Sequence, residues 1–169
     1  DAYSVSISIL SLISVAALAA LVASYIPIVS GKDNTVVSAI TSNFLSVLSV
    51  LTLGISLVAI VGVRPLIFLF ASGFNEETVS LAAQFLRITL PFCFCMVVLN
   101  LTLGYMQHKN SFWYQGVSAI LANTVIIISI FLSHQSIQRL AWGYALSLLL
   151  PAAAGLFLAK GGGLELRPS

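Results

Sequence analysis

The chain has 169 residues, of which 59% are hydrophobic and only 7% are charged, and its formal net charge is +2. An ordinary soluble domain contains about 25% charged residues, so this composition excludes a soluble protein. The few basic residues are scattered singly, so no polybasic patch of the kind that binds nucleic acid is present.

Five long stretches of the chain carry no charged residue. Each is about as long as, or longer than, the ~20 residues that cross ~30 Å of hydrocarbon as a helix. Strands of a membrane barrel are shorter and alternate in polarity, whereas these stretches are continuously apolar. We therefore predict an all-α integral membrane protein, a bundle of about five transmembrane helices. The predicted bundle covers residues 1–159, with spans at about 3–28, 40–63, 88–106, 112–132 and 140–158.

The segment between the second and third spans, 65–86, is less uniformly apolar. It follows Arg64 and contains Asn75 directly before Glu76 and Glu77. An asparagine before two acidic residues is typical of a capped helix start. We predict an outer helical hairpin over 65–86 that stands above the membrane surface.

The turns between the spans are short, which predicts that consecutive helices are antiparallel neighbours in one bundle. Pro91 and Pro151 lie inside the third and fifth spans, where a proline removes a backbone donor and tends to kink a helix. Residues 160–169 are predicted to form a polar tail. Because the chain begins at Asp1 without a methionine and has an odd number of spans, we expect it to be an excerpt of a longer protein.

The basic residues near the span ends predict the orientation. The larger of two groups marks the cytoplasmic side, so the first residue is expected outside and the Gly-rich tail in the cytoplasm. The two groups are Lys32, Lys109, Lys160 and Arg167 on one side, and Arg64, Arg87 and Arg139 on the other.

Polar side chains within the predicted spans are the candidates for function. Hydroxyl residues recur at intervals of three and four in two spans, which places them on one stripe of each helix. Such stripes either line a hydrated path for a polar cargo or allow close helix contact. The buried amides either bond to a neighbouring helix or contact the cargo. The hydroxyl stripes are Ser4, Ser8 and Ser11, and Ser38, Ser42, Ser46, Ser49, Thr52 and Ser56, and the amides are Asn100 and Asn123.

Arg64 and Arg87 fall at predicted membrane boundaries. Arginines there either extend toward the interface or attract the phosphate group of an anionic lipid. Cys93 and Cys95 lie on different faces of one helix, so neither a disulfide nor a metal site is predicted. No hydrolase, metalloprotease or nucleotide-binding motif is present, so neither an enzyme nor a cofactor is predicted.

Three segments resemble the MurJ (MviN) type of lipid-linked precursor flippase. They are "DAYSVSISIL", "FLFASGFNEETVSLAAQFLRITLPF" and "LNLTLGYMQHKNSFWYQGVSAILANTVII". The resemblance implies helices two to six of a fourteen-helix exporter of the multidrug/oligosaccharidyl-lipid/polysaccharide superfamily, within the first of its two lobes. It also implies alternating access that moves an undecaprenyl-linked saccharide across the bacterial cytoplasmic (inner) membrane.

The family resemblance implies a substrate pathway and partners. The partners are the lipid-linked saccharide, membrane lipids and the remaining helices of the same protein. The family's second helix typically carries arginines for the diphosphate, whereas about Ser8 to Leu21 contains none here, so the cargo stays open. A cation-coupled multidrug exporter and a non-transporting scaffold for cell-wall synthesis are the alternatives. The candidate pathway residues are Asp1, Ser8, Ser11, Ser42, Ser46, Ser49, Asn100 and Asn123.

Overall fold

The computed structural model describes residues 2–70, 73–133 and 136–165, and in the first helix it leaves out the side chains of 2, 5, 13–23 and 26. Within these ranges every regular element is helical, as the sequence predicts. The elements are α1 (Ala2–Val29), α2 (Asn34–Val61), α3 (Val63–Phe70), α4 (Glu76–Thr89), the short 3-10 turn η1 (Leu90–Phe92), α5 (Cys93–His108), α6 (Trp113–Leu132) and α7 (Ile137–Gly161).

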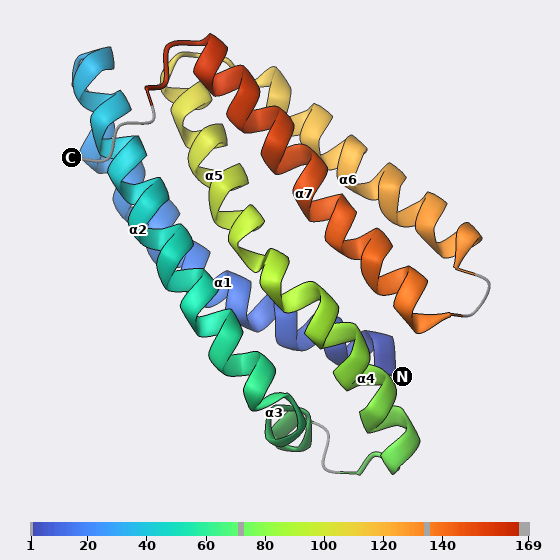
Figure 1. The fold of residues 1–169 in the computed structure, drawn as a ribbon. Coiled ribbons are helices and arrows are strands. Elements are labelled where there is room, and N and C mark those ends of the chain that lie inside the picture. Colours follow the sequence, from blue (N-terminus) through green and yellow to red (C-terminus); the bar gives the residue numbers. More distant parts are fainter. Residues whose placement is uncertain (1, 71–72, 134–135, 166–169) are drawn as a thin grey trace.

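The helices form an antiparallel bundle around a central rod made of α4, η1 and α5 (Figure 1). Helix α2 packs on one side of α5, and α7 packs on the other side. Helix α1 crosses behind the rod and contacts both α4 and α5. In the most apolar stretch of this rod, 50% of the residues are buried. In the corresponding stretch of α6, which packs chiefly on α7, only 6% are buried. The rod is therefore the core of the bundle, and α6 lies at its edge.

The rod extends beyond the predicted third span. The sequence predicts a hairpin ending at 86 and a new helix from 88, but the helical path continues from Glu76 to His108. The interruption lies instead at Pro91, inside the 3-10 turn η1. A proline lacks the N–H that an α-helix requires, so the local tightening at this position has a direct cause.

The helix ends follow local sequence signals. Asn75 caps α4, because its side chain accepts a hydrogen bond from the Thr78 N–H at 3.0 Å, as predicted. Gly31 and Asn110 adopt positive φ angles of 74° and 57° in the turns after α1 and α5. Glycine and asparagine tolerate this left-handed conformation best, which allows both turns to be short.

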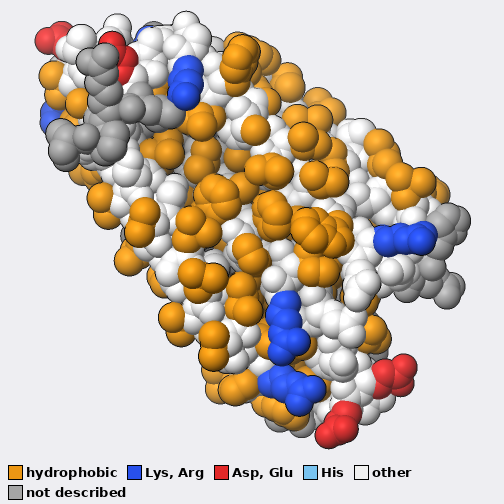
Figure 2. Space-filling model, viewed as in Figure 1, with side chains coloured by type: hydrophobic (Ala, Val, Ile, Leu, Met, Phe, Trp, Pro, Cys, Tyr) orange, Lys and Arg blue, Asp and Glu red, His pale blue; other side chains and the backbone are white. Residues whose placement is uncertain are grey.

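The molecular surface has an apolar middle and charged ends (Figure 2). Four helical segments of the described part are long and apolar enough to cross a membrane: α2, the α4–α5 rod, α6 and α7. Helix α1 has 28 residues and no charged side chain, and its crossing of the membrane stays a prediction. These features make the protein an all-α integral membrane protein.

The last described residues, after α7, pack against the bundle. Helix α7 continues to Gly161, so the predicted tail begins inside it. Leu164 is buried among side chains of α1, α2 and α5, and the Glu165 N–H donates to the Ser38 hydroxyl at 2.8 Å. The Lys109 ammonium donates to the Gly162 carbonyl. These contacts bring the turn after α5, the start of α2 and the end of α7 to one end of the bundle.

Candidate substrate pathway and membrane interface

The hydroxyl stripe of α1 is open. Ser4, Ser8 and Ser11 are exposed, whereas Ile9 and Leu10 on the other side of the helix are buried. The Ser8 and Ser11 hydroxyls donate to the carbonyls of Ser4 and Ile7 at 2.9 and 2.7 Å, which satisfies their donors within the helix. Their oxygens remain able to accept further hydrogen bonds from outside. Asp1, the other predicted pathway residue of this helix, lies outside the described residues.

The hydroxyl stripe of α2 is largely covered. Ser42 is 1% exposed, and Ser46 and Ser49 are half-buried on the helix that packs mainly on α5. The Ser46 hydroxyl donates to the Ser42 carbonyl at 3.0 Å, while the Ser49 hydroxyl is buried without a partner among the described residues. In this conformation the stripe allows close contact between α2 and α5.

The two amides in the apolar band bond within their own helices. The Asn100 side chain donates to the Met96 carbonyl at 2.8 Å, and the Asn123 side chain donates to the Ala119 carbonyl at 2.9 Å. Asn100 is half-buried on α5, whereas Asn123 is exposed on α6. Within the described part of the chain, neither amide hydrogen-bonds to a serine of α1, and a pathway shared by these residues stays a prediction.

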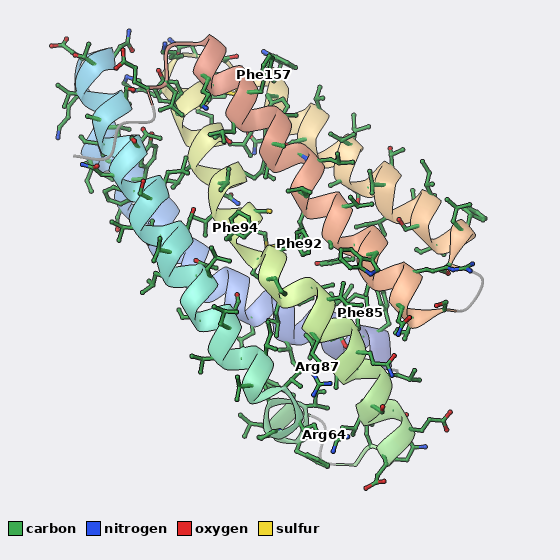
Figure 3. All side chains as sticks on the ribbon, viewed as in Figure 1. Arg64, Phe85, Arg87, Phe92, Phe94 and Phe157 are labelled. Atoms are coloured by element: carbon green, nitrogen blue, oxygen red, sulfur yellow. The ribbon has the colours of Figure 1, made fainter. Side chains whose placement is uncertain are left out.

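Arg64 and Arg87 lie on the same face of the molecule, near the end at which α3 lies (Figure 3). Arg64 belongs to α3 and Arg87 to the last turn of α4, and both are exposed. Arg64 lines a hollow of about 260 Å³ between these helices, together with Phe68, Glu76, Val79 and Ser80.

Two buried tyrosine contacts were not predicted from the sequence. The Tyr25 hydroxyl of α1 lies 2.7 Å from the Thr41 hydroxyl of α2, and the Thr41 hydroxyl itself donates to the Val37 carbonyl. Tyr114 of α6 donates to the Pro151 carbonyl of α7 at 2.6 Å. A single sequence does not pair residues from different helices. The only signal is the presence of tyrosines and glycines within apolar runs.

A second hollow, of about 440 Å³, lies at the opposite end from Arg64. Lys109, Ser38, Asn34 and Glu165 line it, so it joins the start of α2, the turn after α5 and the end of the described chain. Its one ammonium group already donates to Gly162. Among the described residues, no three His, Cys, Asp or Glu side chains lie close enough together to hold a metal ion.

A charge-poor helical bundle, with charged groups at its ends and hydroxyl and amide groups within its apolar band, defines a multi-pass membrane protein. A family model described as "Lipid II flippase MurJ" matches residues 1–169. The chain therefore belongs to the MurJ lipid II flippase family, a family of transporters in cell-wall synthesis rather than of enzymes. No significant match is found among curated proteins or among solved structures.

Proposed function

We propose that this chain forms part of the first lobe of a flippase that moves a lipid-linked cell-wall precursor across the bacterial cytoplasmic membrane. Lipid II, or a related undecaprenyl-linked saccharide, is the proposed cargo, and alternating access is the proposed mechanism. The observation that carries the proposal is the family match over all 169 residues. In the proposed orientation, the end with α3 faces outward and the end with Lys109 faces the cytoplasm.

The exposed stripe of α1 is the proposed wall of the pathway. A sugar headgroup offers many hydroxyl donors, and the free acceptor sites of Ser8 and Ser11 suit such a cargo. The absence of arginine from α1 means that this helix offers the diphosphate no charge. Residues outside α1 must then hold the phosphate groups. For this reason the cargo is proposed separately from the family to which the chain belongs.

Depletion of the complete protein in living cells tests transport. Lipid-linked precursor should accumulate in the inner leaflet, and its exposure to an external precursor-cleaving toxin should fall. Normal outer-leaflet exposure after depletion would rule out the flippase function. Restored exposure on re-expression controls for indirect effects of depletion.

Single cysteines test the pathway and separate a transporter from a scaffold. Ser8→Cys and Ser11→Cys should react with a water-soluble thiol reagent, whereas Ser42→Cys, on the covered stripe, should be protected. The native Cys93 and Cys95 are buried and contribute little background. If Ser8→Cys and Ser11→Cys stay unreactive under all conditions, a path for polar cargo along α1 is excluded and the scaffold alternative gains.

A further inference from the structure

We propose that Arg64 and Arg87 together form a binding site for the phosphate group of a membrane phospholipid, at the membrane surface on the side of α3. The site goes beyond the proposed transport function, since its ligand is a resident lipid. It rests on three properties of the structure: the depth of the two guanidinium groups, the amphipathic helix beside them, and their shared face.

The length of the rod indicates how deep Arg87 lies in the membrane. The charge-free run from Ile88 to His108 is about 31 Å long as a helix, which matches the ~30 Å hydrocarbon layer. Lys109 follows this run at one end and Arg87 precedes it at the other. When Lys109 is placed at one boundary of the hydrocarbon, Arg87 therefore lies at the opposite boundary.

Helix α2 fixes the depth of Arg64 independently. Helix α2 has 28 residues and no charged side chain, and it is about 42 Å long, close to the ~40–45 Å of a bilayer with its headgroups. Arg64 lies three residues after the end of α2, so it lies at headgroup level when Asn34 is placed at the opposite surface. One arginine thus approaches the phosphate layer from the hydrocarbon side and the other from the aqueous side.

Helix α3 has the character of an interfacial helix. It lies across the direction of α2, and Figure 1 shows it almost end-on. Val63 and Ile67 are buried against the bundle, whereas Phe68, Leu69 and Phe70 are 49%, 79% and 47% exposed. Exposed aromatic and aliphatic side chains beside a cation suit the boundary between headgroups and acyl chains.

The two arginines share one face of the molecule. Figure 3 shows both near α3, with Arg87 closer to the middle of the molecule. Helices α3 and α4 pack on each other, and Arg87 is on the same face of α4 as Ser80 and Glu76, which line the hollow beside Arg64. Glu76 is the one carboxylate among the residues that line the hollow beside Arg64. Arginine forks bind phosphate oxygens in pairs, which favours a specific site over general attraction.

The test uses the complete protein in nanodiscs of phosphatidylcholine with added phosphatidylglycerol, followed by native mass spectrometry of the released protein. The Arg64→Gln/Arg87→Gln variant should retain about tenfold less phosphatidylglycerol, as expected when charge-assisted hydrogen bonds to a phosphate are lost. Arg139→Gln is the matched control, because Arg139 is an exposed arginine at the start of α7. It should retain phosphatidylglycerol as the wild type does.

Further variants and probes keep the test decisive. The single variants Arg64→Gln and Arg87→Gln should each show a smaller loss, and both side chains are exposed, so folding is not at risk. Equal retention by the double variant and the wild type would overturn the proposal, as would an equal loss in Arg139→Gln. In nanodiscs that also contain a lipid-linked diphosphate, retention of that lipid with no retention of phosphatidylglycerol would also overturn the proposal and would assign the arginines to the cargo.

Discussion

At the scale of single residues, two buried tyrosines differ in whether their hydroxyl group has a hydrogen-bond partner among the described residues. The Tyr114 hydroxyl links α6 to α7 by a hydrogen bond to the Pro151 carbonyl. The Tyr105 hydroxyl is buried without a partner among the described residues, although the Lys109 ammonium lies 5.1 Å from the centre of its ring. The two tyrosines therefore form a natural pair for separating the contribution of a hydroxyl from that of a ring.

Tyr114→Phe should lower the stability of the protein by about 1 kcal/mol, because it removes one buried interhelical hydrogen bond and leaves the Pro151 carbonyl without that donor. Tyr105→Phe is the control, and it should leave stability unchanged or raise it, since it removes an unpaired buried oxygen and keeps the ring under Lys109. The midpoint of thermal unfolding in detergent measures both. A larger loss in Tyr105→Phe than in Tyr114→Phe would contradict this account.

At the scale of helices, close crossings depend on glycine. A methyl group placed on Gly104 of α5 would lie 2.8 Å from a ring carbon of Tyr25 in α1. That ring has little freedom to move, because it is buried and its hydroxyl contacts Thr41 of α2. Thr41 gives its own proton to the Val37 carbonyl, so Tyr25 is the donor in this contact. The position therefore couples three helices.

Gly104→Ala should destabilise the protein by roughly 1–3 kcal/mol, since either α1 or the Tyr25 ring must shift to make room. Gly116→Ala in α6 is the matched control, because nothing lies within 4 Å of the added methyl group. Alanine favours a helix over glycine, so the control should be neutral or slightly stabilising. Thermal unfolding again provides the comparison, and a neutral Gly104→Ala would show that the α1–α5 contact is adaptable.

At the scale of the whole molecule, the sequence predicts elements better than it predicts their partners. Uncharged runs predict the all-helical membrane fold, because lipid imposes one simple requirement on composition and length. Asn75 is predictable as a cap, because its signal lies within four residues. The continuation of α4 through Arg87 is not predictable in this way, since a charged residue at a membrane boundary resembles a helix end. The covering of Ser42 and the openness of Ser8 depend on which helices pack together, and that is a property of the tertiary fold.

The arrangement of the two ends can be tested on the complete protein in intact cells. Single cysteines at Ser30 and Asn110 should behave alike toward a membrane-impermeant thiol reagent, and a cysteine at Glu77 should behave in the opposite way. The first two residues are exposed in the turns after α1 and α5, at the end joined by the contacts of Lys109 and Glu165. Glu77 lies at the start of the rod, whose length is about 50 Å and exceeds the ~40–45 Å bilayer.

In the proposed orientation, Glu77→Cys reacts in intact cells, and Ser30→Cys and Asn110→Cys react only after the membrane is permeabilised. Cys93 and Cys95 are buried within the bundle and can stay in place. Reversal of all three results would keep the bundle and invert its orientation, which would place the Arg64 and Arg87 site in the cytoplasmic leaflet. Different behaviour of Ser30→Cys and Asn110→Cys would contradict the antiparallel packing itself, since both turns would no longer share one membrane surface.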